Sequence, residues 1–166
     1  MTLVAGVILV QLVSRGQPET GTAEETKTEI KNEVNSNSIR IGNLLANVPD
    51  TWMGIRPSSS MRLREFRLGV AADDATLAIF KNIGGTIDNN LERWSGQFGY
   101  SLSDSEVNIR AENINGMQVS IISILGTYTN TMAFSNATQP KPNYRLLGAI
   151  ADTPDGLYYF KLTGPN

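Results

Sequence analysis

The stretch IGGTIDNNLERWSGQFGY, residues 83–100, decides the fold expected for this chain. Its apolar residues recur at helical spacing and would form one narrow stripe: Ile87, Leu91, Trp94 and Phe98. Thr86 suits the N-cap, and Asp88 falls in the first turn, where a negative charge is favoured. We therefore expect one strong amphipathic helix that packs on a sheet through its tryptophan side. The opposite side would face solvent with Asp88, Asn89, Glu92 and Arg93.

The glycine pair Gly84–Gly85 in front of this helix admits two interpretations. Backbone amides at a helix N-terminus can bind phosphate, as in a P-loop, but a P-loop follows its glycines with Lys and Ser or Thr. Here the first charge after the pair is Asp88, which would repel a phosphate. We favour a turn in which the glycines supply positive φ or a close approach of strand and helix.

Strand-like segments precede the helix. Alternation predicts strands over residues 38–45, 61–68 and 75–81, the last two as antiparallel neighbours, with turns at Pro49-Asp50 and Asp73-Asp74. Strict alternation in MRLREFRL would place Met61, Leu63, Glu65 and Arg67 on one face. It would place Arg62, Arg64, Phe66 and Leu68 on the other.

Two hairpins are expected after the helix. Asn115-Gly116 joins the strand-like runs 107–113 and 117–129, and both residue types tolerate positive φ. Thr153-Pro154-Asp155-Gly156 divides residues 144–164 in the same way. Hairpins grouped around one helix predict an α+β fold with an antiparallel sheet, and they argue against a parallel βαβ fold.

The chain is expected to have three parts. Residues 1–16 carry an apolar run, Leu3–Val13, whose length as a helix is about 17 Å at about 1.5 Å per residue, against the ~30 Å core of a bilayer. No basic segment precedes it and no A-x-A-like cleavage site follows. It is either a truncated signal or anchor whose true start lies upstream of Met1, or the N-terminus of a cytoplasmic protein. Residues 17–37 form a polar spacer, helical in part over 23–34, and residues 38–166 form a single α+β domain.

Composition excludes several functions. A net charge of −2 gives no basic field for nucleic acid, so no nucleic-acid partner is expected. With no Cys and no His, the commonest general base, thiolate nucleophiles and the commonest metal ligands are missing. We accordingly assign no catalytic residue, no metal ligand and no cofactor.

Four arginines are the candidate partner-binding residues: Arg56, Arg62, Arg64 and Arg67. The alternative is a solvated sheet face on which Arg stems cover apolar surface. Ser58-Ser59-Ser60 lacks a lysine at S-x-x-K spacing, so no nucleophile is expected there. The two tryptophans, Trp52 and Trp94, are expected in or at the edge of the core. The tyrosines of the strand-like runs are assigned to packing rather than to an exposed binding platform: Tyr128, Tyr144, Tyr158 and Tyr159.

Three segments together resemble a set of poorly characterised bacterial exported or membrane-anchored proteins. The shared pattern is P-x-S-S-M-R-x-x-x-F, then GG-x-x-x-x-N-x-x-R-W-x-x-Q-F, then LTGP. It is matched at Pro57, Ser59, Ser60, Met61, Arg62, Phe66, Gly84, Gly85, Asn90, Arg93, Trp94, Gln97, Phe98 and Leu162–Pro165. The resemblance covers roughly residues 48–165. It implies export or anchoring and brings no reaction, cofactor or catalytic residue.

The segment VPDTW, residues 48–52, followed by a strand, also resembles PsbP-like and DcrB-like domains, which implies an α/β/α sandwich around an antiparallel sheet. In the exported proteins a further helix usually follows the TGP segment, whereas this sequence stops at Asn166. Either another element, such as residues 23–34, covers that sheet face, or the face is left for a partner, because an uncovered apolar face of several hundred Å² predicts association.

Three functions remain open at this point. The leading hypothesis is a non-catalytic accessory or binding domain, exported or membrane-associated, that acts on a protein or small ligand through its sheet face or loops. The rival is a hydrolase or lyase that uses carboxylates such as Glu65, Asp73 or Asp74, which a pocket holding two acids about 5–9.5 Å apart would favour. The third is a subunit of a larger membrane assembly.

Overall fold

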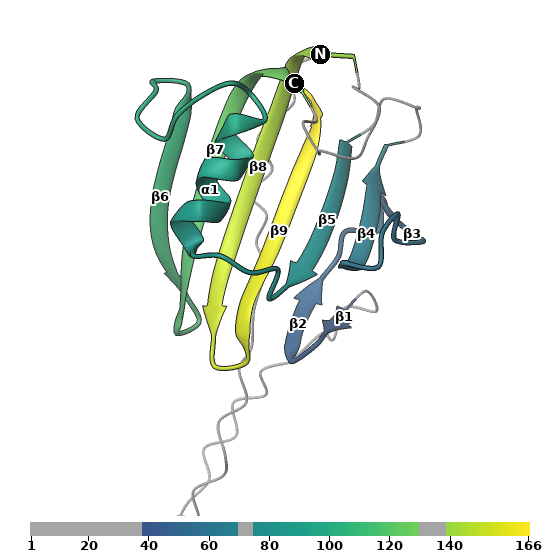
Figure 1. Cartoon of the computed structure of the whole chain (residues 1–166). Coiled ribbons are helices and arrows are strands. Elements are labelled where there is room, and N and C mark those ends of the chain that lie inside the picture. Colours follow the sequence, from purple (N-terminus) through teal and green to yellow (C-terminus); the bar gives the residue numbers. More distant parts are fainter. Residues whose placement is uncertain (1–37, 70–74, 130–138) are drawn as a thin grey trace, which may run out of the picture.

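The computed structural model describes residues 38–69, 75–129 and 139–166, and within them it is mostly antiparallel β-sheet with one short helix, α1 (Figure 1). The main sheet has seven strands in the order β3-β4-β5-β9-β8-β7-β6, and β1 pairs with β2 in a separate hairpin. The elements are β1 Ser38–Ile41, β2 Leu44–Asn47, β3 Trp52–Ile55, β4 Arg62–Leu68, β5 Ala75–Lys81, α1 Ile87–Gly96, β6 Val107–Ile114, β7 Met117–Tyr128, β8 Lys141–Thr153 and β9 Gly156–Pro165. The expected α+β class with an antiparallel sheet is confirmed.

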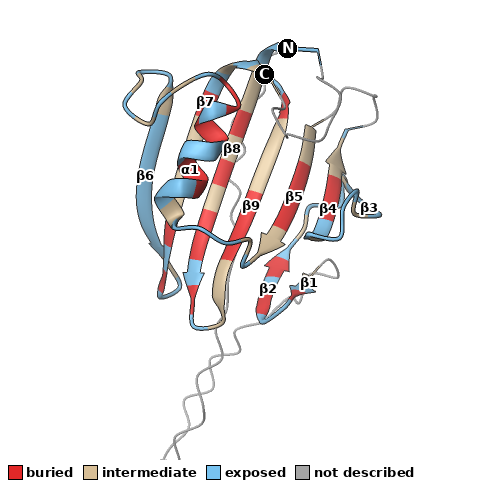
Figure 2. Cartoon of the chain, viewed as in Figure 1, coloured by how far each residue is buried: buried red, intermediate tan, exposed pale blue. Residues whose placement is uncertain are grey.

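The helix lies on one face because the chain must cross the sheet between two runs of antiparallel strands. Strands β3, β4 and β5 are paired in chain order, as are β6, β7, β8 and β9, and β9 returns beside β5. The connection from β5 to the far edge strand β6 contains α1, which lies in front of β7 and β8 in Figure 1. Figure 2 shows β6 exposed along most of its length, as expected of an edge strand, whereas β7, β8 and β9 carry most of the buried residues of the main sheet.

The start of α1 confirms the turn interpretation of the glycine pair. Gly84 and Gly85 have φ of 83° and 74°, and the Asn90 side-chain amide donates to the Gly84 carbonyl at 2.9 Å. Thr86 is the N-cap: its hydroxyl accepts from the Asn89 amide at 3.1 Å, and its own amide donates to the Asn89 side chain at 3.2 Å. The backbone amides of Thr86 and Asn89 are therefore already paired within the helix cap.

The buried side of α1 agrees with the predicted stripe, although the helix ends at Gly96 and Phe98 follows it. Leu91, Trp94 and Phe98 are buried, Ile87 is half-buried, and the four residues expected in solvent are exposed. Burial of such side chains contributes about 1.5–3 kcal/mol each as an upper bound. Trp94 reaches the sheet at Gly148, where an added Cβ would lie 2.4 Å from a ring carbon. The glycine thus leaves the space that the indole occupies.

The predicted first strand, residues 38–45, is wrong as a single strand. It is a hairpin, β1–β2, whose two-residue turn is Gly42-Asn43, with φ of 60° at Gly42. Gly-Asn between apolar residues is itself a hairpin signal, which outweighs the alternation on either side. Ile41, Leu44 and Ala46 pack against the face opposite α1, where the Asn43 amide donates to the Tyr158 hydroxyl at 3.3 Å.

The other predicted strands and turns in the described residues are confirmed. β5 has the predicted bounds and pairs antiparallel with β4. The predicted Pro49 turn precedes β3 and is closed by the Trp52 amide, which donates to the Pro49 carbonyl at 3.0 Å. Asn115 and Gly116 both have positive φ, of 51° and 83°, and Ile114 pairs with Met117 across them. Thr153 pairs with Gly156 around Pro154-Asp155.

The prediction that the tryptophans and the strand tyrosines pack in the core is confirmed in part. Trp94 is buried and Trp52 is half-buried beside Phe66, with ring centroids 6.3 Å apart. Tyr158 and Tyr159 are buried, which confirms packing for both, while Tyr128 and Tyr144 are half-buried and stacked at 6.1 Å.

Several predictions fall on residues outside the described ranges. They are the apolar segment 1–16, the spacer 17–37 with its helix over 23–34, and the Asp73-Asp74 turn. No helix in the described part of the chain is long and apolar enough to cross a bilayer.

The contact between Trp94 and Gly148 gives a stability test. Gly148→Ala adds a methyl group against the indole and the Ile122 side chain, so we expect the free energy of unfolding to fall by about 1–3 kcal/mol. Gly96→Ala is the matched control, because open space surrounds its Cβ and the change should be neutral or raise that free energy by up to ~1 kcal/mol. Urea unfolding measures both, and equal stability of Gly148→Ala and the wild type would contradict the close contact.

Candidate functional site

A lysine lies in the middle of the main sheet, on the face that carries α1. Lys161 belongs to β9, the fourth of the seven strands, and pairs with Ala78 on one side and Gly148 on the other. Residues directly opposite each other in an antiparallel pair share a face, so Glu65, Ala78, Lys161 and Gly148 form one row across the sheet. Both neighbours of Lys161 are small. Trp94 fills the space above Gly148, while the space above Ala78 remains open.

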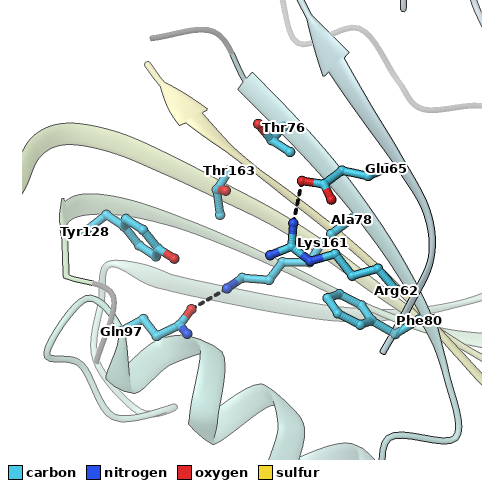
Figure 3. Close-up of a pocket in the computed structure, with 9 residues that line it drawn as sticks. All are labelled: Arg62, Glu65, Thr76, Ala78, Phe80, Gln97, Tyr128, Lys161 and Thr163. Atoms are coloured by element: carbon cyan, nitrogen blue, oxygen red, sulfur yellow. Dashed lines mark hydrogen bonds and ion pairs between the residues drawn. The ribbon is translucent and has the colours of Figure 1, made fainter. Parts of the chain in front are cut away.

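That open space is a cavity of about 230 Å³ beside the end of α1 (Figure 3). Its walls come from β4, β5, β7, β9 and the residue that follows α1. The lining residues are Arg62, Glu65, Thr76, Ala78, Phe80, Gln97, Tyr128, Lys161 and Thr163.

The Lys161 amine is enclosed without a carboxylate partner. Its Nζ donates to the Gln97 side-chain oxygen and lies 5.5 Å from the centroid of the Tyr128 ring, and no carboxylate among the described residues pairs with it. Burial, together with the positive charges of Arg62 and Arg93, lowers the pKa of Lys161 to about 7. The side chain as a whole is only half-buried because its stem lines the cavity, but the low pKa follows from the surroundings of the amine.

The carboxylate in the cavity wall is already paired. Glu65 is 5% exposed; its Oε1 accepts from Arg62 Nη1 at 2.5 Å, and its Oε2 accepts from the Ser58 amide at 2.7 Å. The Arg62 guanidinium also lies 5.8 Å from the centroid of the Phe80 ring. Figure 3 shows Arg62 between Glu65 and the Lys161 stem. Glu65 therefore holds Arg62 against the wall and does not neutralise Lys161.

A bulge in β4 corrects the predicted faces of that strand. Arg62 pairs with Phe80 and Glu65 with Ala78, two residues apart on β5, so Arg62 and Glu65 share the cavity face although they are three apart in sequence. The register shifts between Arg62 and Arg64, which strict alternation did not anticipate. Downstream of the bulge the predicted faces hold, since Phe66 and Leu68 pack on the opposite side.

The four candidate arginines do not form one cluster. Arg62 lines the cavity, and Arg67 shares its face because it pairs with Thr76. Arg67 Nε is the one buried side-chain nitrogen or oxygen of the described residues that has no hydrogen-bond partner. Arg64 is exposed and pairs with Ile79 on the opposite face, and Arg56 is exposed just after β3. A role for all four in binding a partner stays a prediction.

The predicted acids are not brought together in the described part of the cavity. Glu65 is the single carboxylate among the described lining residues, and Asp73 and Asp74 lie outside the described ranges. The pair of acids that would favour a hydrolase or lyase is therefore not among the residues placed here.

The sequence reasoning missed the most informative residues, Lys161 and Gln97. Lys161 lies in YYFKLTG, between residues that pack as core, and a lysine in a central strand without a nearby acid was the available signal. Gln97 follows directly after α1, and its backbone accepts from the Thr129 amide at 2.8 Å, which ties the end of β7 to the helix end. Gln97 lies close to Lys161 only because of how the helix docks on the sheet, so no local pattern in the sequence indicates this contact.

Comparisons with known proteins add no assignment to this site. No protein-family model matches the sequence, and a comparison with curated proteins found no significantly similar one.

The enclosed amine predicts a characteristic pH dependence. Lys161 has a folded-state pKa of about 7 against an ordinary value of 10.5, so between these values the unfolded chain binds more protons. The free energy of unfolding should rise with pH across that window, and the cost of enclosing the charge should be fully present below pH 7.

Between pH 6 and pH 9 we expect the free energy of unfolding of the wild type to rise by about 1–3 kcal/mol more than that of Lys161→Met, allowing for partial solvent screening. Urea unfolding of both proteins at the two pH values measures the gain. The groups that face this amine are Arg62, Glu65, Arg93 and Tyr128, and both proteins retain them. A difference that does not change with pH would show that the amine titrates normally.

Proposed function

We propose that this chain is a non-catalytic binding domain that holds a small ligand with one anionic group in the cavity beside α1. The observation that carries the proposal is the Lys161 amine, which lies in the cavity without an acidic partner among the described residues. A buried cation is costly unless it is paired, and a bound anion would supply the missing charge.

The cavity walls indicate the class of ligand. Phe80 and Tyr128 offer aromatic surface, and Thr76 and Thr163 offer hydroxyl groups. A volume of about 230 Å³ is slightly below the range of roughly 300–1,000 Å³ that is usual for ligand pockets. A molecule of about ten non-hydrogen atoms, with a carboxylate on an apolar body, suits this size and lining.

The resemblance to exported bacterial proteins supports a shared site in the same place. Each of the three segments that carry the resemblance contributes to the cavity: Arg62 from the first, Gln97 from the second and Thr163 from the third. Other matched residues hold the N-terminal part of α1 in place: Arg93 donates to the Asn90 side-chain oxygen at 2.6 Å, and the Asn90 side-chain amide donates to the Gly84 carbonyl. We propose on this basis that the chain is related to those proteins and, more distantly, to PsbP-like domains.

We further propose that the domain acts outside the cytoplasm or at a membrane, alone or within a membrane assembly. The apolar run over residues 3–13 and the polar residues 17–37 support this location. The genomic sequence upstream tests it: a basic segment and further apolar residues in frame before Met1 would support export or anchoring. A ribosome-binding site immediately before Met1 would favour the cytoplasmic alternative.

Titration of the full chain with benzoate at pH 6 tests the proposed ligand class. The Lys161 amine is largely charged at this pH, so we expect isothermal titration calorimetry to detect benzoate and to detect benzamide, its neutral analogue, at least tenfold more weakly. Ala78→Val, which adds bulk to the cavity floor, and Lys161→Met should each weaken benzoate binding at least tenfold.

Lys141→Met is the matched control, because Lys141 is exposed and lies outside the cavity lining. It should bind benzoate as the wild type does. Equal binding of benzoate and benzamide, or wild-type affinity in both Ala78→Val and Lys161→Met, would overturn the proposal.

A further inference from the structure

Lys161 differs from the other described lysines in its surroundings. Lys81 forms an ion pair with Asp155 at 2.7 Å, and Lys141 is exposed beside the Tyr144 ring. Lys161 alone among them lines the cavity, where a neutral amide oxygen, that of Gln97, accepts from its amine. A Gln oxygen accepts one N–H without contributing a charge, so nothing there requires the amine to keep its third proton.

We propose that Lys161 captures small carbonyl compounds that carry a carboxylate, such as aldehyde acids, by forming a reversible imine in the cavity. This inference rests on the proposed function, because the same cavity must admit the anionic ligand. It adds a covalent step to binding and names the atom that reacts, Lys161 Nζ.

The step is balanced without a further reactant. The neutral amine attacks the carbonyl carbon, a C–N bond forms, and the carbonyl oxygen takes up the proton that the nitrogen releases. The resulting carbinolamine loses its hydroxyl group and the remaining N–H proton as water, which leaves a C=N bond. Hydrolysis reverses both steps, so no oxidant or reductant takes part.

Charges around the amine favour both the attack and the placement of the carboxylate. The amine faces Arg62 and Glu65 from β4, Arg93 from α1 and Tyr128 from β7. Burial and the two arginines lower the pKa of Lys161 to about 7, which makes much of the amine neutral near pH 7, while burial raises the pKa of Tyr128 and keeps its hydroxyl protonated. Arg62 lies within the cavity wall and is paired with Glu65 through Nη1, and its guanidinium has further N–H donors from which a carboxylate can accept.

Reductive trapping with glyoxylate tests the inference on the full chain. Glyoxylate and sodium cyanoborohydride at pH 7 convert each imine to a stable carboxymethyl amine, which peptide mass spectrometry assigns to a lysine. We expect Lys161 to be modified at least tenfold faster than Lys141, the internal control in the same molecule. The rate at Lys161 should fall at pH 5.5, where its amine is largely protonated, and benzoate should slow the modification of Lys161 but not of Lys141.

Three outcomes would count against the inference. Equal rates at Lys161 and Lys141, with benzoate still bound in calorimetry, overturn imine formation and leave the proposed function standing. Equal rates together with no benzoate binding overturn both. Fast modification of Lys161 that Ala78→Val leaves unchanged, in a variant whose unfolding transition shows it to be folded, would place the reaction outside the cavity.

Discussion

The structure depends on the contact between one indole and one glycine. Trp94 lies against Gly148 in the central part of the sheet, and this contact fixes where a ten-residue helix docks on a sheet of seven strands. A helix of that length covers only part of the face. The uncovered part, above Ala78, becomes the cavity, and Lys161 lies at the boundary between the two.

The same arrangement explains why Lys161 is unusual. A lysine on an open sheet face would extend into water, but the end of α1 places Gln97 over its amine and β7 places Tyr128 beside it. The bulge in β4 brings Arg62 to this face, where Glu65 holds it. The two cations of the cavity, Arg62 and Lys161, thus come from β4 and β9. Glu65, the one acid among the described lining residues, is already paired with Arg62.

The opposite face of the main sheet is held by apolar contacts and by hydrogen bonds of Tyr158. The hairpin β1–β2 covers it through apolar contacts, and the hydroxyl of Tyr158 joins that hairpin to the last hairpin by donating to Asp155 at 2.7 Å. Asp155 also pairs with Lys81, so this acid is fully used in holding the fold together. The two faces of β9 therefore carry a satisfied network around Tyr158 and an unsatisfied charge at Lys161, and only the second suits a ligand.

The sequence by itself determined the local elements: the α1 N-cap at Thr86, the turns at Asn115-Gly116 and Pro154-Asp155, and the antiparallel hairpins, because each depends on backbone preferences and side-chain periodicity within a few residues. It also contains the Gly42-Asn43 turn signal, although the alternation on either side favours one continuous strand. Only the tertiary structure decided the bulge that turns Arg62 toward the cavity, the strand order that sets Ala78 and Gly148 on either side of Lys161, and the position of Gln97 over its amine. These depend on pairing between segments far apart in the chain, for which no single stretch of residues carries a pattern.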